Sequence, residues 1–318
     1  MGALYLREQD VDVLLDMRTS IEVVEEALRN LASGGAVNVP RQRAIGQGAI
    51  MHTMSAAAPY LGLLGFKAYS TTREHARFLV GIADQATSEL VALIEADRLG
   101  QLRTGATTGV AVGSLARDDA AEVGLFGAGH QAATQLEAVC AVRPIKEAFV
   151  YSRQHDRRER FAAEMSLRLG IEVTPVDRPQ EAAEELPIVV TATNSREPVF
   201  DGSGLAEGTL VCAIGSNWPN RAELDSVAVR RADNIVCDNV ECCRLEAGDF
   251  NDAIDKGLFD WRQAVNLSDV LTGHAVGRNN RQSVVIFKSV GMAIEDLAAG
   301  AKVLALARER GLGIELPV

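Results

Sequence analysis

A glycine-rich turn in the middle of the chain constrains the fold more than any other feature. The apolar run 122–126 leads directly into Gly127-Ala128-Gly129-His130-Gln131-Ala132 and then into a segment with helical spacing. Between a strand and a helix, this G-x-G-x-x-A pattern holds a dinucleotide pyrophosphate, because the glycines permit a tight turn and close approach and the helix N-terminus offers unpaired N–H groups. An ordinary glycine-rich turn is the alternative, but the strand–turn–helix setting favours a dinucleotide.

The sequence after Ala120 alternates between short apolar runs and helical segments. The apolar runs are EVGLF, EAFVYS, IEVTPV, PIVVTAT, GTLVCAIG and NIVCD. Near-continuous apolar strands that alternate with helices are typical of a parallel sheet covered on both faces. We therefore predict a Rossmann-type, doubly wound α/β domain with six strands over residues 118–282.

The remaining sequence predicts a second, discontinuous α+β domain made of residues 1–117 and 283–318. Four apolar runs between residues 49 and 97 predict a mixed or antiparallel sheet. Thr19 and Glu22 have the spacing of a capping box, which predicts the start of a helix that ends at Gly34-Gly35. The last segment reads as a strand followed by a long helix, and we expect it to return to this first domain.

Composition excludes several classes of function. The formal net charge is −11, and the arginines between residues 153 and 160 are interrupted by acidic residues, so no nucleic-acid surface is expected. No apolar run reaches the roughly 18 residues of a membrane span, and the acidic start is unlike a signal peptide, which predicts a cytoplasmic protein without a membrane partner. The five cysteines form no C-x-x-C pair, so we expect reduced thiols and no metal site.

The residues after the second strand of the dinucleotide domain predict which cofactor binds. An acidic residue there would accept a hydrogen bond from the ribose 2′-OH of NAD and repel a 2′-phosphate. This chain has Tyr151-Ser152-Arg153, with no carboxylate until Asp156. NADP(H) is therefore favoured over NAD(H), the alternative being that Arg153 stacks over the adenine.

Several stretches together resemble the ornithine cyclodeaminase/mu-crystallin family. They are PRQR (40–43), GFK (65–67), LRTGA (102–106), GAGHQA (127–132), AIGSNWPNRAELD (213–225) and FKSVGMAIEDLAA (287–299). The resemblance implies a homodimer of two-domain subunits. It also implies that the first domain carries the substrate site and the dimer interface, and that the Rossmann domain presents the nicotinamide across a cleft. The family includes cyclodeaminases, alanine dehydrogenases and imine or ketimine reductases, so it implies fold more firmly than substrate.

The resemblance also implies a cationic substrate site. The family's carboxylate-binding arginine maps onto Arg41, with Arg43 close enough to compete, its active-site lysine maps onto Lys67, and a second arginine maps onto Arg103. An arginine fork binds a carboxylate through two parallel hydrogen bonds, and a lysine can add charge or relay a proton. A surface ion pair is the alternative for each. His52 is a candidate substrate contact or a structural histidine.

The residues expected to bind the cofactor include the glycine-rich turn and positions that follow other strands. They are Thr104, Gly127, Ala128, Gly129, His130, Gln131, Ser152, Arg153, Thr191, Ala192, Thr193, Gly215, Ser216, Ser289 and Gly291.

One departure from the family pattern bears on the reaction. Cyclodeaminases are expected to carry an Asp in the turn after the fifth Rossmann strand, where this chain has Ser216-Asn217. Asn cannot take up a proton, so Asn217 could orient a ligand but could not act as a general base. This favours an oxidoreductase acting on the C–N bond of a small amino or imino acid: an imine or ketimine reductase, or an alanine dehydrogenase-like enzyme. A cyclodeaminase-type lyase that releases ammonia and a non-enzymatic NADPH-binding protein remain the alternatives.

Overall fold

The computed structural model describes residues 2–317, and the chain divides into two compact units. The first unit comprises Met1–Ala106 and Gly291–Val318, and the second comprises Thr107–Val290. Each unit has its own sheet, as expected for an α/β chain with a Rossmann-type domain and a discontinuous α+β domain.

The first unit is built on a seven-stranded sheet with helices on one face. Its elements are β1 (Leu4–Leu6), α1 (Glu8–Leu14), α2 (Met17–Ala32), β2 (Val37–Ile45), β3 (Ile50–Ala58), β4 (Leu63–Thr71), β5 (Ala76–Asp84), β6 (Leu90–Glu95), the first half of α3 (Asp97–Leu115), α10 (Ala293–Arg310) and β15 (Ile314–Glu315). The strand order is β15-β1-β6-β5-β4-β3-β2, with antiparallel pairing from β2 to β6 and a parallel pair between β1 and β6. The predicted mixed sheet is confirmed.

Helix α2 corrects one sequence prediction. Its N-cap is Asp16, whose carboxylate accepts a hydrogen bond from the Thr19 backbone N–H at 2.7 Å. Thr19 therefore lies inside the first turn, and the predicted capping box of Thr19 and Glu22 is wrong, because the helix begins three residues earlier with Asp16 as its cap. The helix ends before Gly34, which has a φ of +76°.

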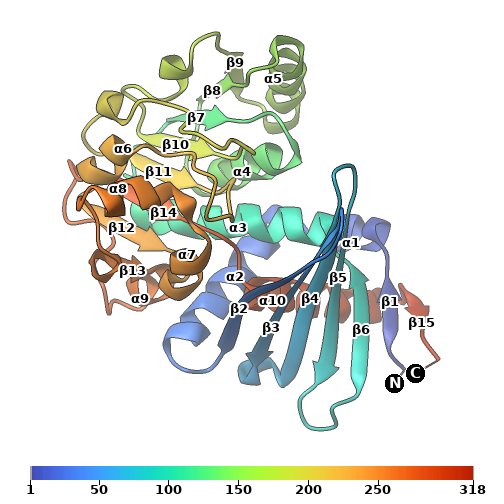
Figure 1. The fold of residues 1–318 in the computed structure, drawn as a ribbon. Coiled ribbons are helices and arrows are strands. Elements are labelled where there is room, and N and C mark those ends of the chain that lie inside the picture. Colours follow the sequence, from blue (N-terminus) through green and yellow to red (C-terminus); the bar gives the residue numbers. More distant parts are fainter. Residues whose placement is uncertain (1, 318) are drawn as a thin grey trace. The chain divides into compact units, whose positions relative to one another are not determined.

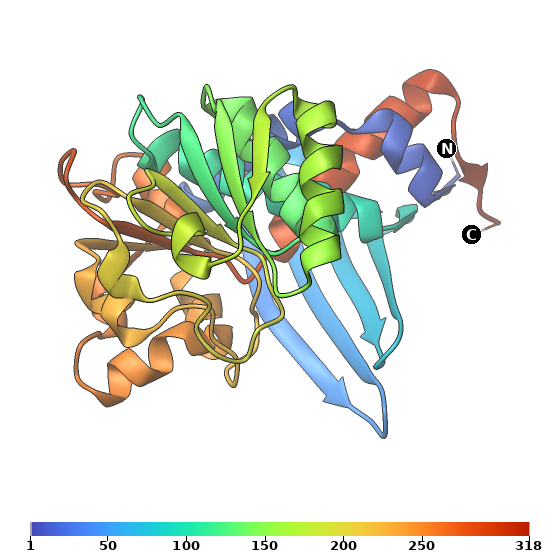
Figure 2. The ribbon, with the colours of Figure 1, turned by 90° about the horizontal axis from the view of Figure 1, so that it is seen from above.

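The two faces of the sheet in the first unit differ in character. Helix α10 runs along the inner face and packs on β3, β4 and β5 (Figure 1). Alternation along β4 and β5 places Lys67, Tyr69 and Val80 on this inner face and Phe66 and Leu79 on the outer face. Figure 2 shows β2 to β5 (blue to cyan) as long strands. The inner face is buried, whereas the outer face leaves apolar side chains exposed.

The second unit is built on an eight-stranded sheet in which every pairing is parallel. Its elements are the second half of α3, β7 (Glu122–Phe126), α4 (His130–Val142), β8 (Glu147–Tyr151), α5 (His155–Leu169), β9 (Glu172–Pro175), β10 (Ile188–Thr191), β11 (Leu210–Ala213), α6 (Ser226–Arg231), β12 (Asn234–Cys237), α7 (Val240–Glu246), α8 (Asn251–Asp255), β13 (Ala264–Asn266), α9 (Leu267–Leu271) and β14 (Val285–Lys288). Strands β10, β11 and β14 are buried at every residue, as strands covered on both faces should be.

Two strands of this sheet depart from the sequence prediction of six. The strand of the last segment, β14, lies between β11 and β12 in the second unit, so only the helix that follows it returns to the first unit. Strand β13 is an additional short edge strand of three residues. The strand β14 was predicted but assigned to the wrong sheet, because an apolar run does not specify the sheet that it joins. Strand β13 was not predicted, since three residues are too short to show a periodic pattern. Between β9 and β10, residues Pro179–Ala182 form a short 3₁₀ turn.

Candidate functional site

The glycine-rich turn has the geometry that a dinucleotide requires. Strand β7 ends at Phe126, and Gly127 follows with a φ of +116°, a backbone conformation that residues other than glycine rarely adopt. A Cβ on Gly127 would also lie 2.5 Å from the Ala192 carbonyl oxygen. Helix α4 then begins at His130 with Gly129 as its N-cap, so the first N–H groups of the helix remain available for an anion. This backbone cradle, which a side chain would fill, fits a pyrophosphate.

Four neighbouring strands bring most of the expected cofactor residues to one edge of the second sheet. The strand order around the turn is β8-β7-β10-β11-β14, and Phe126 pairs with Thr191, Thr191 with Ala213, and Ala213 with Lys288. The loops that begin at residues 127, 192, 214 and 289 therefore leave the sheet side by side. In doubly wound folds this carboxyl edge, where the strand order reverses, is the ligand-binding edge. Thr104 and Gly291 belong to the first unit instead.

The loops after β10 and β11 are supported by a buried carboxylate that the sequence did not indicate. Glu223 accepts hydrogen bonds from the hydroxyls of Thr191 and Thr193 and from the backbone N–H groups of Thr193 and Gly215. Thr191 is fully buried, so its side chain supports this loop rather than facing a ligand. Burial raises the pKa of Glu223, and the nearby Lys288 ammonium opposes that shift.

In the first unit, a buried cluster of ion pairs surrounds the predicted lysine. Lys67, on β4, donates a 2.7 Å hydrogen bond to Oδ1 of Asp296 on α10. Arg103, on α3, donates through Nε to the same Asp296 oxygen at 3.1 Å and through Nη1 to Oε2 of Glu295 at 2.6 Å. The two carboxylates are completely buried, and the two cations are 4% and 6% exposed. Glu295 and Asp296 were missed because acidic residues in the first turn of a helix are ordinary in sequence.

The surroundings of Lys67 lower the pKa of its ammonium group. Burial, together with the charges of Arg103 and Arg41, lowers the pKa of Lys67 to about 8, although the Asp296 carboxylate opposes the shift. A group with a pKa near 8 can give and take a proton at physiological pH. Gly100 of α3 leaves room for this ammonium, since a Cβ there would lie 3.1 Å from Lys67 Nζ.

Arg41 lies within an irregularity in the pairing of β2 with β3, between Val39 and Gln42, and Arg43 lies just after it. Arg41 is 9% exposed, and its charge contributes to the lowered pKa of Lys67. Arg43 pairs in register with His52, and its charge helps to lower the pKa of that histidine. Of the two arginines, Arg41 is therefore the one that belongs to the cluster around Lys67.

An aromatic row lies beside these cations on the same inner face. The rings of His52 and Tyr69 are stacked with centroids 4.1 Å apart, and Phe78 follows at 5.0 Å from Tyr69. The Arg41 guanidinium lies 6.0 Å from the Tyr69 ring centre, and Lys67 Nζ lies 5.5 Å from that of Phe78. The row places apolar surface next to buried cations, a combination that suits a small molecule with one carboxylate and a carbon ring or chain.

His52 is a neutral member of this row. Burial, with the charges of Arg43 and Arg41, lowers the pKa of His52 to about 4, so the ring is uncharged at neutral pH. Its Nε2 lies 3.1 Å from the Thr71 hydroxyl. A neutral, stacked imidazole can offer a polar contact to a ligand but adds no positive charge to the cluster around Lys67.

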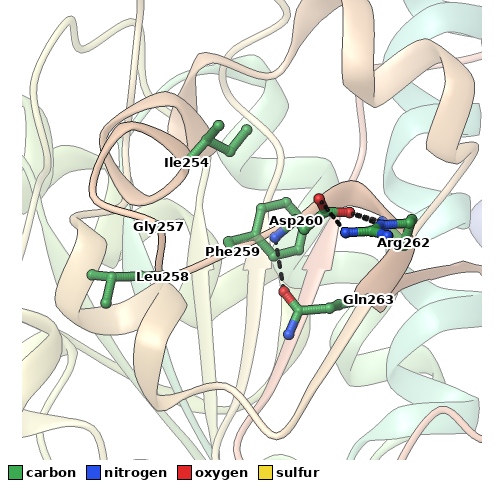
Figure 3. Close-up of a pocket in the computed structure, with 7 residues that line it drawn as sticks. All are labelled: Ile254, Gly257, Leu258, Phe259, Asp260, Arg262 and Gln263. Carbon is green, nitrogen blue, oxygen red and sulfur yellow. Dashed lines mark hydrogen bonds and ion pairs between the residues drawn. The ribbon is translucent and has the colours of Figure 1, made fainter.

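A separate hollow in the second unit lacks this chemistry (Figure 3). The pocket has a volume of about 630 Å³ and lies beside α8 and the turn that follows it. Its polar groups are engaged within the turn, since Asp260 accepts from Arg262 at 2.8 and 3.1 Å and Gln263 accepts from the Asp260 backbone N–H at 2.8 Å. The rest of its wall includes Ile254 and Leu258. We therefore place no reaction there.

Membrane-spanning and metal-binding features were not found within residues 2–317. No helix in this range is long and apolar enough to cross a membrane, and no three of its His, Cys, Asp or Glu side chains gather closely enough to hold a metal ion.

Comparisons with known proteins agree with the geometry of both units. The family model for the ornithine cyclodeaminase/mu-crystallin family matches residues 3–310. A Δ1-pyrroline-2-carboxylate reductase of Bacillus cereus is 33% identical over 268 residues, covering 82% of this chain and 82% of the relative.

Two solved structures share the fold over nearly their whole length. The Δ1-pyrroline-2-carboxylate reductase of Thermococcus litoralis, in complex with NADH and L-proline, has a TM-score of 0.95 and 34% identity and covers 98% of this chain and 100% of its own. An archaeal alanine dehydrogenase dimer with bound NAD has a TM-score of 0.94 and 29% identity, with 99% of each chain covered. The predicted resemblance is thus confirmed, and the chain belongs to the ornithine cyclodeaminase/mu-crystallin family.

Proposed function

We propose that this protein is a nicotinamide-dependent oxidoreductase that reduces the C=N bond of a small imino acid, or oxidises the corresponding amino acid. The buried cluster of Lys67, Asp296 and Arg103 carries the proposal, because it combines carboxylate-binding charge with a proton donor whose pKa is near 8. A cyclic imino acid such as Δ1-pyrroline-2-carboxylate is the leading substrate, since relatives with that activity share about a third of the sequence.

Each residue of the proposed substrate site has a distinct role. Arg41 and Arg103 bind the substrate carboxylate, and the aromatic row formed by His52, Tyr69 and Phe78 contacts its carbon skeleton. Lys67 gives a proton to the imine nitrogen. A nicotinamide cofactor, when bound, would supply the hydride for the imine carbon. The product is the amino acid, with one proton and one hydride added across the former double bond. Asn217 orients the bound ligand by hydrogen bonds.

The dinucleotide is assigned to the second unit, with NADP(H) favoured. In place of the sequence-based bounds, which divide the chain after residues 117 and 282, the substrate-binding and dimerisation domain is assigned to the first unit (Met1–Ala106 and Gly291–Val318) and the dinucleotide domain to the second (Thr107–Val290). Strand β8 ends at Tyr151, and the following Ser152 and Arg153 are suited to a 2′-phosphate, whereas no carboxylate is present there to receive a 2′-OH. The solved relatives named above hold NADH or NAD, so this preference is a property proposed for this chain alone.

The protein is further proposed to be a cytoplasmic homodimer that pairs through the outer face of the first sheet. That face exposes a set of large apolar side chains, which are Val37, Val39, Met51, Leu64, Phe66 and Leu79. An apolar area of this kind on a sheet is a common subunit interface. The archaeal alanine dehydrogenase relative is a dimer.

A substrate panel separates this function from its alternatives. Purified protein is mixed with NADPH or NADH and either Δ1-pyrroline-2-carboxylate, Δ1-piperideine-2-carboxylate, or pyruvate with ammonia, and the nicotinamide absorbance is followed. Consumption of the reduced cofactor supports the proposal. Ammonia release from ornithine without net cofactor oxidation would identify a lyase, and cofactor binding without turnover of any substrate would identify a binding protein.

A further inference from the structure

A buried hydrogen-bond network outside the proposed substrate site centres on Glu223, at the carboxyl edge of the second sheet. Its Oε1 accepts from the Thr193 backbone N–H and hydroxyl, both at 2.7 Å. Its Oε2 accepts from the Thr191 hydroxyl at 2.9 Å and from the Gly215 backbone N–H at 2.8 Å. One completely buried carboxylate thus receives four donors, one from the last residue of β10 and three from the loops that follow β10 and β11.

Two further buried charged residues, Asp249 and Lys288, support Glu223. Asp249 Oδ1 accepts from the Glu223 backbone N–H at 2.6 Å, and Asp249 Oδ2 lies 2.8 Å from Lys288 Nζ. Lys288, at the end of β14, donates to the Ser216 carbonyl oxygen at 2.8 Å. The network therefore returns to the loop after β11 from its other side, and Asp249 and Lys288 are also almost completely buried.

The close approach of the two loops depends on Gly215. A Cβ at this position would collide with the Thr193 backbone and with the Glu223 carboxylate. The backbone of one loop is therefore packed directly on the other, with the carboxylate between them. A change in the Glu223 side chain should therefore move the backbone of both loops, because closely packed groups leave no space to absorb a displacement.

We infer that Glu223, supported by Asp249 and Lys288, is a positioning group that shapes loops 191–193 and 214–217 for the nicotinamide half of the dinucleotide. The inference rests on the proposed function, which assigns the dinucleotide to this edge. In a doubly wound sheet the two halves of a dinucleotide lie on opposite sides of the point where the strand order reverses. The adenine half then belongs to the side of β8, with Ser152 and Arg153, and the nicotinamide half to the side of β10 and β11.

This placement makes a prediction that a merely structural role would not make. Replacing Glu223 with Gln offers an NH₂ group where one of the two backbone N–H donors needs an acceptor, so one loop must shift. Binding of NADPH, which uses both halves, should then weaken. Binding of 2′-phospho-ADP-ribose, which lacks the nicotinamide, should be retained because the turn at residues 127–132 is unchanged.

The experiment measures both ligands by calorimetric titration of the full-length protein. For Glu223→Gln we expect NADPH affinity to fall by about tenfold or more and 2′-phospho-ADP-ribose affinity to stay within about twofold. Thr191→Val removes one donor to Glu223 without changing shape and should lower NADPH affinity in the same selective way, by about threefold. It carries the test if the Gln variant fails to fold.

Asp225→Asn is the matched control. Asp225 is two residues from Glu223, but its carboxylate caps α6 through Ala228 and binds the Gly202 N–H, away from the two loops. This variant should lower the melting temperature and leave the ratio of the two affinities unchanged. Equal losses for both ligands in Glu223→Gln and Thr191→Val, or no loss for either ligand, would overturn the inference. If the unmodified protein bound neither ligand, the cofactor assignment itself would fail.

Discussion

The Lys67 ammonium donates a 2.7 Å hydrogen bond to the Asp296 carboxylate, and both side chains are buried between the first sheet and α10. The pair joins a strand to a helix more than two hundred residues later in the chain. Asp296 keeps the lysine protonated in a place where burial and two arginines would otherwise remove its proton. The balance between these effects sets the pH range over which Lys67 can serve as a proton donor.

The first prediction concerns that pH range. Lys67 must be protonated to give a proton, and its pKa is about 8, so the rate of imine reduction should be constant below pH 8 and fall as pH rises through it. Asp296→Asn removes the charge that raises the pKa of Lys67, so the falling limb should move to lower pH, by about one unit or more. The measurement is kcat against pH at saturating substrate.

Glu295→Gln provides the control for this shift. Glu295 is as buried as Asp296, but it pairs with Arg103 rather than with Lys67. Removing its charge should lower the stability of the fold but shift the falling limb of the pH profile less than Asp296→Asn does. Equal shifts in the two variants would show that the lysine does not set the pH dependence.

A second prediction uses two glycines of helix α3. A Cβ at Gly100 would lie 3.1 Å from Lys67 Nζ, whereas a Cβ at Gly113 would have open space. Gly113→Ala should therefore stabilise the protein by about 0.5–1 kcal/mol, because alanine favours a helix, and leave turnover unchanged. Gly100→Ala should gain less stability and reduce kcat by about tenfold, because a displacement of the ammonium by a few tenths of an ångström misplaces the proton donor. Thermal unfolding measures the stability of the two variants, and steady-state kinetics measure their kcat. Identical kcat values for the two variants would contradict the prediction.

A third prediction tests the cofactor preference. The unmodified protein should bind NADPH more tightly than NADH, and Arg153→Ala should reduce NADPH affinity by about tenfold while changing NADH affinity by less than about twofold, since only NADPH offers a phosphate to the guanidinium. Competition titrations with the two cofactors measure this. Tighter binding of NADH by the unmodified protein would contradict the predicted preference for NADPH and would match the NADH- and NAD-bound relatives.

A fourth prediction concerns assembly. Phe66 is 45% exposed at the centre of the apolar outer face, so Phe66→Asp should convert a dimer into a monomer, because a carboxylate buried at an interface without a partner is costly. Leu167 on α5 is 89% exposed and offers a matched control, since Leu167→Asp should leave the mass unchanged. Light scattering after gel filtration gives the masses. A monomeric unmodified protein, or a Phe66→Asp dimer, would exclude this interface.

The sequence predicted the fold where local patterns determine it. The glycine turn, the alternation of strands and helices and the apolar runs of the first unit all specify structure within short segments, and each was confirmed. The position of β14 was missed because strand order depends on long-range packing that a local pattern does not contain. The start of α2 was misplaced by three residues, since Asp16 and Thr19 are both good caps in sequence.

The cations of the proposed substrate site were predicted by resemblance, but their partners were not. Glu295 and Asp296 look like ordinary acidic residues at the start of a helix, and Glu223 and Asp249 look like loop residues. Their roles depend on burial and on contacts made across long sequence separations. The local sequence does not indicate which acidic residue will be buried against a lysine. The roles of these carboxylates therefore follow from the structure and not from the sequence.

The most direct test of the account is the single-turnover rate of imine reduction in Lys67→Met. Lysine is replaced by a neutral side chain of similar length, so NADPH affinity should be unchanged while the rate falls by about a hundredfold or more, the usual contribution of a general acid. Lys256→Met, which removes an exposed lysine paired with Asp252 at 2.7 Å, should leave the rate unaltered. A Lys67→Met rate within a few-fold of the unmodified protein would contradict the assignment of Lys67 as the proton donor.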